Sequence, residues 1–544
     1  MHVRNIYMNS ILFFIFCTFL LLCINYAPAM LRMNTLSSGF SVKLSWYPML
    51  GVSCLWIYDY FIKKNRKIII DRYLLYILCY CFFLFVGECI GLIRFPYYQQ
   101  LVLGSISQIE KAPLVMHFFD KIGFQCTDEE FILGWFTIRQ LRSGMSYILY
   151  TWVFALVLGY YISTFWNRSI MLIKRAVYIS IIVIVFCAII ELFYLMGNEM
   201  AKYVLVHITP YFHEVYSDGR DYPPLLWYTP QIRSIFIEPS NFGMYAVLVN
   251  PLLWVNILKN TGYKKIAWGI CSIVFTFFVF LSQARTSTLL LILQFAVLIF
   301  LIVYKKNNCF KNITAIFVPI IISFLLSIMV ISNFIITPVG DNKPALTTKV
   351  ENNNAALMTE ITEYADNNIT SVVDSGENAN RKGSNTTRKA IYITNLNIGL
   401  DYPLFGVGYK LNGAYFVDYM PLELTQDNAE IQKWIGYMKA QGIMRYTLPN
   451  IGEYVTKFSS TGIIGVLFLV FPWIYVGLKL LSKLRRYSQA NALWYDSAWI
   501  FIGLVGVFVS GFGDEFVFYT PWAVLALSFA ILKQYDKNKF DVKS

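Results

Sequence analysis

The sequence has little charge for its length. Only 14% of its 544 residues are Asp, Glu, Lys or Arg, and 57% are hydrophobic. Soluble domains carry about a quarter charged residues, so this composition excludes an ordinary soluble protein and indicates a chain that lies mostly in a bilayer. The formal net charge is +13. The basic residues are spread between apolar runs, however, which argues against a nucleic-acid-binding patch.

The sequence also lacks a disulfide framework and a metal-binding motif. Eight of the ten cysteines fall in apolar runs, Cys309 lies in a short basic loop, and Cys126 is the one cysteine in a candidate outer loop. No CxxC pair, no Cys/His spacing typical of zinc and no other metal-ligand cluster occurs. We therefore expect no metal and no cofactor.

Apolar runs long enough to cross a bilayer, which takes about 20 residues, dominate the chain. Twelve such runs are predicted as spans, near residues 9–29, 44–62, 73–94, 144–166, 172–196, 238–258, 266–282, 286–304, 312–336, 460–481, 493–511 and 517–532. The first has no convincing signal-peptide cleavage site, so it is predicted to be retained. The sequence predicts an all-α, polytopic helical membrane protein.

The charge of the short loops predicts the orientation of these spans. With a cytoplasmic N-terminus, the inside segments hold 23 Lys and Arg residues, whereas the short outside turns hold only Arg32, Lys43 and Arg285. Positive residues accumulate on the cytoplasmic side. We therefore expect both termini in the cytoplasm.

This orientation divides the chain into three parts, which are 1–336 with the first nine spans, 337–459 as one large periplasmic loop, and 460–544 with the last three spans and a cytoplasmic tail. Two further outer loops are expected near 95–143 and 197–237. The part of the large loop from Asp341 to Arg388 is rich in Asn, Thr and Glu and is predicted to be a mobile cover. Helices are predicted after it, over Arg388–Asn397 and Leu424–Arg445.

A first group of candidate site residues precedes the sixth span. Arg233 and Glu238 lie close together in the sequence at the outer surface, followed by Pro239 and Asn241. A carboxylate and a guanidinium at this interface suit glycosyl or phosphoryl transfer, as base and anion clamp. The alternative is that Glu238 only stabilises the start of a helix.

A second candidate is Arg285, in the short turn Ser282–Ser287 between two spans. An outer arginine opposes the general charge pattern, and its planar fork suits phosphate oxygens. The alternative is an interfacial anchor for the eighth span.

A third group lies in the large loop. Arg388 is followed by Gly399, which could cap a short helix, and then by the segment Asp401–Tyr409 with Pro403, Gly406 and Gly408. The glycines permit a tight backbone but are no nucleotide-binding loop, because neither a Walker lysine nor a Rossmann context is present.

Other ionisable residues are weaker candidates. Glu88 and Glu191 fall within spans, where a charge is costly and indicates pairing or a cavity. Glu191, near the outer end of the fifth span, is the better site candidate. His207 and His213 lie in an outer loop and are expected to be incidental. The segment from Glu453 to Gly465 re-enters the membrane, and its small residues favour close helix packing.

These segments, in this order, resemble the O-antigen polymerase and O-antigen ligase superfamily of bacterial envelopes. The similar segments are Ile237–Gly243, the Ser-Arg-Thr turn in Leu281–Ser287, the Pro-Leu-Phe-Gly-Val-Gly motif in Asp401–Tyr409, and the Thr-Gly-Ile-Ile-Gly segment in Ser460–Gly465. Ligases of this family carry a His-Asn pair shortly before the last segment, where this sequence has Ile451-Gly452. The resemblance therefore favours the Wzy-type polymerase branch, whose Arg-x10-Gly pattern Arg388 and Gly399 also fit.

The resemblance implies a glycosyltransferase in the bacterial inner membrane, acting on undecaprenyl-diphosphate-linked glycans at the periplasmic face. It implies a chain-length regulator and a flippase of the same pathway as possible partners. Arg233 and Arg285, together with Arg388, are the predicted cations of the diphosphate clamp, and Glu238 is the predicted base or an orienter of Arg233. The predicted substrate-binding residues are Arg388, Asn241, Gly406, Gly408, Tyr409 and Glu191.

Two alternatives remain open at this point. One is a ligase that transfers glycan to lipid A core. The other is a lipid-linked oligosaccharide flippase or other transporter, although the sequence shows few charges within spans and no internal repeat or inverted pair of broken spans.

Overall fold

The structure is a computed structural model, and it describes residues 2–24, 44–62, 71–102, 106, 109, 112–211, 231–305, 309–334, 379–443, 446–487, 492–516 and 519–541. These residues form helices and no strand. Among them, nine helices are long and apolar enough to cross a membrane. The predicted all-α, polytopic membrane fold is therefore confirmed.

The spanning helices follow the predicted apolar runs three to eleven. They comprise α4 (Asp71–Arg94), the continuous helix formed by α7 (Asp128–Ile148), η6 (Leu149–Val153) and α8 (Phe154–Thr164), then α9 (Trp166–Leu195), α11 (Pro239–Lys259), α12 (Gly262–Leu281), α13 (Arg285–Lys305), α14 (Cys309–Phe334), α21 (Glu453–Arg486) and α22 (Ala492–Ser510).

The first, second and last predicted spans are helical but shorter or more polar. They correspond to α1 (His2–Leu20) with η1 (Leu21–Cys23), to α3 (Trp46–Ile57) with η3 (Tyr58–Ile62), and to α23 (Thr520–Asp541). The apolar part of the first is Tyr7–Cys23, and α23 turns polar after Leu532. The count of twelve spans stays a prediction.

Helix α11 is the centre of the bundle. It packs against α12, α13 and α22, and 89% of its apolar window is buried inside the protein. Side chains of two of these helices hydrogen-bond the backbone of α11. The Gln294 amide of α13 donates to the Val247 carbonyl (2.8 Å), and the Trp499 indole of α22 donates to the Leu248 carbonyl (2.9 Å). Such bonds between helices fix their register in a bilayer, where apolar burial alone discriminates little.

The fourth span begins earlier than its apolar run. Helix α7 starts at Asp128 instead of near residue 144, because Thr127 and Glu130 form a capping box at its start. The Thr127 N–H donates to the Glu130 carboxylate (2.9 Å), and the Glu130 N–H donates to the Thr127 hydroxyl (3.3 Å). Reciprocal bonds of this kind satisfy N–H groups that a helix start leaves open. The helix therefore continues about four turns beyond the apolar run.

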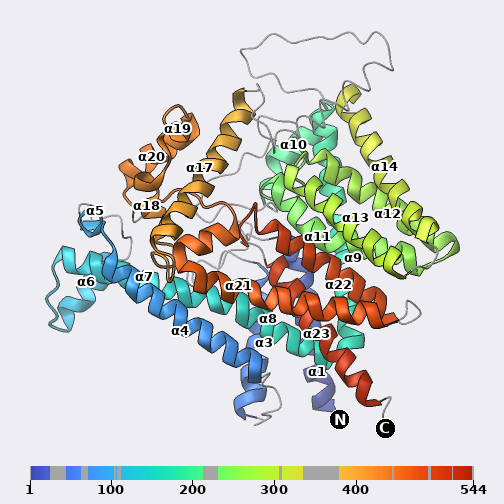
Figure 1. The fold of residues 1–544 in the computed structure, drawn as a ribbon, viewed down its shortest axis with the longest axis horizontal. Helices are drawn as coiled ribbons and strands as arrows, with labels where there is room; N and C mark the ends of the chain where they lie inside the picture. The colour runs from blue at the N-terminus through green and yellow to red at the C-terminus, as the bar shows by residue number, and fades with distance from the viewer. Residues whose placement is uncertain are drawn as a thin grey trace.

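An outer layer of short helices covers one end of the bundle (Figure 1). Its members are α5 (Tyr98–Val102), α6 (Ala112–Lys121), α10 (Glu199–His207), η7 (Thr209–Tyr211), α17 (Ala379–Asp401), α18 (Asn412–Tyr419), α19 (Leu422–Thr425) and α20 (Ala429–Gln441). Apolar residues of α17, α18 and α20 share a second core with α5 and the start of α7. The later part of the predicted large loop is thus a packed helical unit.

The predicted helices of this loop are present with different bounds. The one predicted over Arg388–Asn397 extends to Ala379–Asp401, and the one predicted over Leu424–Arg445 is divided into α19 and α20. The division falls at Asn428, whose side chain accepts the N–H groups of Glu430 and Ile431 and so starts α20. Most of the predicted mobile cover, residues 341–378, lies outside the described residues.

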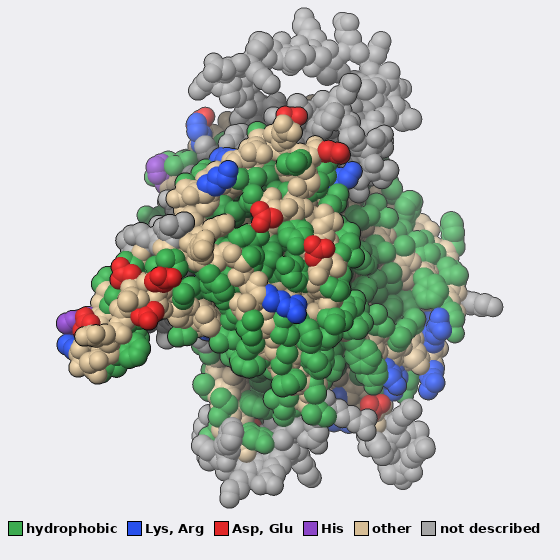
Figure 2. Space-filling view, turned by 60° about the vertical axis from the view of Figure 1, so that its left-hand side comes forward, with side chains coloured by type: hydrophobic (Ala, Val, Ile, Leu, Met, Phe, Trp, Pro, Cys, Tyr) green, Lys and Arg blue, Asp and Glu red, His purple; other side chains and the backbone are tan. Residues whose placement is uncertain are grey.

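The surface of the bundle suits a bilayer. Figure 2 shows a broad apolar face across the middle of the molecule, with charged side chains above it, at the left and at the lower right. Helix α1 and the end of α23 lie at the end of the bundle opposite α17, α19 and α20 (Figure 1). The positions of the two ends agree with termini on one side of the membrane and the outer layer on the other.

Candidate active site

Three polar side chains from distant parts of the chain meet around Asp514, in the loop 511–516 between α22 and α23. An Arg388 nitrogen of α17 lies 4.0 Å from an Asp514 oxygen. The Thr286 hydroxyl, in the first turn of α13, hydrogen-bonds the same carboxyl group, and Glu238 at the start of α11 lies within electrostatic range of it. The set thus combines a cation, two carboxylates and a hydroxyl at one end of the bundle.

Two members of this set are accessible to solvent. The Arg388 side chain is 50% exposed and the Asp514 side chain is 22% exposed. The second Asp514 oxygen, Oδ2, is buried and has no hydrogen-bond partner among the described residues. Burial raises the pKa of Asp514, Arg388 opposes this shift, Glu238 raises the pKa further, and the Thr286 hydroxyl lowers it. A carboxylate with a raised pKa beside a cation is suited to accept a proton.

Glu238 occupies the N-cap position of α11, with Pro239 in the first turn, but its side chain makes no capping hydrogen bond. It accepts instead from the Ser240 hydroxyl (3.3 Å), which also lies 3.4 Å from the Asn241 side chain. Glu238 thus makes no capping hydrogen bond, but its position at the start of α11 also suits the helix dipole, so its role as base stays a prediction. The proposed substrate contact of Asn241 stays a prediction.

Arg285 begins α13, directly before Thr286. The preceding turn is tight, because Gln283 adopts a left-handed backbone conformation with φ of 47°. The segment before α11 lies against this turn, since the Ile232 N–H donates to the Leu281 carbonyl (3.2 Å) and the Gln231 amide donates to the Gln283 carbonyl (3.4 Å). The first two predicted site groups are thus neighbours, and Arg285 is partly exposed beside them.

Arg233 and Glu191 form a buried ion pair. The guanidinium and carboxylate lie 3.4 Å apart, with each side chain 2% exposed. The Glu191 carboxylate also accepts the backbone N–H groups of Arg233 (2.9 Å) and Ser234 (2.6 Å). These bonds hold the segment before α11 against α9. Arg233 and Glu191 therefore have a structural role next to the site. Direct contact of either with substrate stays a prediction.

The segment 403–409 packs on an interruption of α21. That helix breaks at Gly462, which has φ of 64° and ψ of −172°. The freed backbone groups pair with the segment, because Val407 and Gly408 donate to the Ser459 and Ser460 carbonyls (3.0 Å each), and the Ile463 N–H donates to the Pro403 carbonyl (2.8 Å). Two of the motifs that carry the resemblance are thus joined backbone to backbone.

Glycines make this close contact possible. A Cβ at Gly406, which has φ of 67°, would lie 2.5 Å from the Ser460 backbone, and one at Gly462 would lie 2.2 Å from the Leu404 oxygen. The described contacts of Gly406 are with protein, so its predicted substrate contact, like that of Gly408, stays a prediction. The expectation that Gly399 caps a short helix is wrong, because Gly399 lies inside α17, where a Cβ would meet the Phe458 ring at 2.2 Å.

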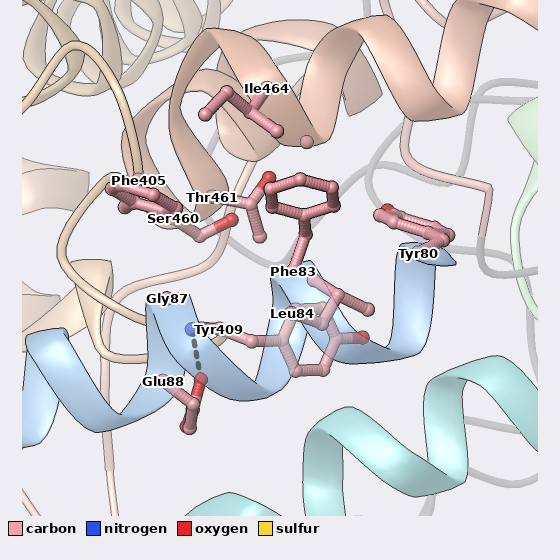
Figure 3. Close-up of a pocket in the computed structure, with 11 residues that line it drawn as sticks. Tyr80, Phe83, Leu84, Gly87, Glu88, Phe405, Tyr409, Ser460, Thr461 and Ile464 are labelled. Atoms are coloured by element: carbon pink, nitrogen blue, oxygen red, sulfur yellow. Dashed lines mark hydrogen bonds between the residues drawn. The ribbon is translucent and has the colours of Figure 1, made fainter. Parts of the chain in front are cut away.

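Tyr409 connects this segment to a narrow pocket and to Glu88. Its N–H donates to the Glu88 carboxylate of α4 (2.6 Å), as Figure 3 shows. Glu88, Tyr409, Phe83, Phe405 and Ser460 are among the lining residues, and the free space is only about 10 Å³. That is room for about one water molecule, so the pocket as it stands does not hold a sugar.

A second polar set lies beside the first. The Lys457 ammonium of α21 is buried 3.7 Å from a Glu453 oxygen and 3.6 Å and 4.3 Å from the ring centres of Tyr147 and Tyr409. Aromatic faces and a carboxylate together stabilise such a buried cation.

Glu453 also holds the loop that carries Asp514. Its N–H donates to the Gly511 (2.8 Å) and Asp514 (3.1 Å) carbonyls, and its carboxylate accepts the Phe516 N–H (2.8 Å). Burial raises the pKa of the next acid in this loop, Glu515, to about 7. The charge of Glu453 also raises this pKa, and Lys457 and Lys410 lower it.

Asp514, Glu515 and Lys457 were not predicted from the sequence. Asp514 and Glu515 are adjacent acids in the outer turn between the last two apolar runs, and a lysine at the start of a span is uncommon. These signals were present but do not by themselves identify a site. Among the described residues, no three His, Cys, Asp or Glu side chains are grouped to hold a metal, and independence of metals stays a prediction.

Comparison with known families agrees with the motifs. Residues 270–431 match the family described as O-antigen ligase. This match supports membership of the O-antigen polymerase and ligase superfamily. The matched region includes Arg285, Arg388 and the segment 401–409, whereas Glu238 and Asp514 lie outside it. No curated protein matches the chain. Members of this superfamily include both polymerase-type and ligase-type proteins, so the match does not separate the two.

Proposed function

We propose that this membrane protein polymerises lipid-linked oligosaccharide repeat units into a surface polysaccharide such as O-antigen. The observation that carries the proposal is the meeting of Arg388, Asp514 and Glu238 at the start of α13, where Arg285 lies. Cations and carboxylates together meet the two needs of glycosyl transfer from a diphosphate carrier, which are stabilisation of the leaving diphosphate and removal of a hydroxyl proton.

In the proposed reaction, a hydroxyl of the incoming unit attacks the anomeric carbon of the growing chain. The bond from that carbon to the diphosphate oxygen breaks, and undecaprenyl diphosphate leaves with the electron pair. Arg285 and Arg388 stabilise the charge that develops on the diphosphate. One of the carboxylates of Glu238 and Asp514 accepts the hydroxyl proton. The growing chain is thereby transferred onto the new unit at the periplasmic face of the inner membrane.

The start of α21 favours polymerase over ligase. Ligases carry their His-Asn pair here, but this chain has Ile451 and Gly452. Gly452 adopts φ of 78°, and an added Cβ would lie 2.9 Å from the Phe512 carbonyl oxygen. The backbone at this position packs against the loop 511–516 and offers no imidazole to the site. Proton transfer is therefore assigned to carboxylates.

A deletion strain tests the function. We expect it to attach one repeat unit to the lipid core and no ladder of longer products, as seen on a lipopolysaccharide gel. Full-length glycan accumulating on the lipid carrier would instead identify a ligase, and a core without any repeat unit would identify a flippase. Complementation with wild type should restore the ladder, whereas Arg285→Ala, at equal protein level, should not. A normal ladder from Arg285→Ala would remove its assigned role.

A further inference from the structure

Helix α6 packs on the start of α7 through one of its faces. Val115 and Phe119, one turn apart, pack against the second core, which also holds residues of α17, α18 and α20. The Phe119 ring of α6 and the Phe131 ring of α7 have their centres 6.4 Å apart. The helix is therefore a fixed part of the outer layer.

A second apolar stripe of α6 runs beside this face and points away from the core. Its members, at four-residue spacing, are Leu114, Phe118 and Ile122. Their exposed fractions are 76%, 56% and 61%. The remaining side of the helix is polar, with exposed His117 and Asp120. Large apolar side chains exposed in one continuous row indicate a contact surface.

The end of α6 holds this stripe in place. The Gly123 N–H donates to the Asp120 carbonyl (3.1 Å) with Gly123 at φ of 74°, and the Phe124 N–H donates to the Phe119 carbonyl (2.9 Å). These two bonds are those of a Schellman motif, which ends a helix with its last carbonyls paired. Phe124, itself 55% exposed, continues the apolar surface beyond the helix.

The stripe lies next to apolar surface on two spanning helices. Ile138 of α7 follows Phe131 by seven residues, or about 10 Å of helix, and is 67% exposed. Ile93, at the outer end of α4, is 83% exposed, and α4 packs against α7. In Figure 2 the lobe at the left, formed by α6 and the start of α7, has acidic side chains on its upper side and apolar side chains at its lower right, toward the apolar face of the bundle.

We propose that α6 is a membrane-surface helix, whose stripe of Leu114, Phe118 and Ile122 lies among the lipid head groups and upper acyl chains on the side of the outer layer. A short helix with adjoining apolar and polar sides is suited to this position. The bilayer is the partner because the stripe continues the surface that the spanning helices present to lipid. The helix thereby fixes the second core, with α17, α18 and α20, at the membrane surface.

The charge of this lobe indicates that apolar burial, and no attraction to anionic lipid, drives the contact. Residues 112–131 contain the acids Asp120, Asp128, Glu129 and Glu130 and one basic residue, Lys121. A surplus of acids opposes binding to anionic head groups. Burial of the apolar stripe favours insertion whatever the charge of the lipid.

Site-directed spin labelling tests the contact. A full-length variant without native cysteines carries one spin label, at Phe118→Cys, and is reconstituted into phosphatidylcholine vesicles. Collisions of the label are measured with oxygen, which concentrates in lipid, and with a nickel complex that stays in water. We expect the nickel accessibility at Phe118→Cys to be at least about fivefold below that at Asp120→Cys, because a helix of this kind buries its apolar face about 5–10 Å deep.

The controls distinguish lipid, water and protein around the stripe. Asp120→Cys is the matched control on the polar side of α6, and Phe82→Cys, 62% exposed on α4, is the reference for lipid. Leu114→Cys repeats the test at the other end of the stripe and should behave like Phe118→Cys. Adding phosphatidylglycerol to the vesicles should leave the result unchanged.

Two results would overturn the proposal. One is nickel accessibility at Phe118→Cys and Leu114→Cys equal to that at Asp120→Cys, which would place the stripe in water. The other is low accessibility to both reagents, which would show that a second copy or another protein covers the stripe. Neither result bears on the polymerase assignment, because accessibility is measured without substrate.

Discussion

At the scale of single residues, Asp514 lies at the centre of the candidate site. One of its oxygens faces Arg388, and the other is buried. Burial and the neighbouring charge of Glu238 both raise its pKa, against the opposing effects of Arg388 and Thr286. A base must be deprotonated to act, so a raised pKa moves the onset of its activity to higher pH.

Substitution at Asp514 and Glu238 separates their roles. With Asp514 as the base, the rate of wild type should rise with pH through a pKa above the usual value of about 3.9. Asp514→Asn should lose at least about 100-fold in rate. Glu238→Gln should move the rise to lower pH, because it removes a charge that raises the pKa of Asp514. Polymerisation rates in reconstituted membranes, measured across pH, give both results.

The matched control is Asp427→Asn, which changes an exposed carboxylate between α19 and α20 and should leave the pH profile unchanged. Full activity in Asp514→Asn together with inactive Glu238→Gln would assign the base to Glu238 instead.

Sequence reasoning found some of these residues and missed others for a physical reason. Arg285 was predicted because an outer arginine opposes the charge pattern, and Arg388 because it accompanies a motif. Asp514 gave no comparable local signal, since acids between spans are ordinary. Its position beside Arg388 follows from contacts across more than 100 residues of chain, which no local pattern encodes.

At the scale of elements, the interruption of α21 joins the large loop to the membrane bundle. Gly462 leaves the helical conformation, and the freed backbone groups bond the segment 403–409. The same segment positions Lys410 and Tyr409. An intact helix at this point would leave the segment without these partners.

Gly462→Ala should therefore destabilise the protein. A Cβ would lie 2.2 Å from the Leu404 oxygen at a φ of 64°, and backbone strain alone costs about 1–3 kcal/mol. We expect a lower melting temperature in detergent and less folded protein. Gly436→Ala in α20 is the control, because an added Cβ there meets nothing within 4 Å. Equal melting temperatures of Gly462→Ala and Gly436→Ala would contradict the structural role of the interruption of α21 at Gly462.

The apolar runs predicted the helices better than their ends. Hydropathy detects the part of α7 that lies in lipid, but not the polar turns that Thr127 and Glu130 stabilise. It likewise missed the division at Asn428, where a capping side chain ends one helical pattern and starts another. The interruption at Gly462 depends on a partner segment about 60 residues earlier, so periodicity cannot show it.

At the scale of the whole molecule, the site lies at one end of a bundle whose orientation is predicted from loop charge. That end also carries α17–α20, whereas α1 and the end of α23 lie at the other (Figure 1). In the proposed function the carrier-linked substrates are periplasmic. The proposed function therefore requires that this end of the bundle faces the periplasm.

Cysteine labelling tests the orientation. In an active background without native cysteines, Leu422→Cys on α19 and Tyr263→Cys on α12 both place a thiol at an exposed position. A maleimide that does not cross membranes should label Leu422→Cys in intact spheroplasts and Tyr263→Cys only after lysis. The reverse pattern would place Arg285 in the cytoplasm and would exclude the proposed reaction.

The position of Asp514 in the chain has a consequence for biosynthesis. The loop 511–516 follows every other part of the site, so a nascent chain contains Arg285 and Arg388 long before it contains Asp514. Glu453 then holds that loop in place only after α22 has crossed the bilayer. In the proposed function, a partly inserted chain would therefore hold the cations that bind the carrier before it holds Asp514, and activity would begin only when insertion is nearly complete.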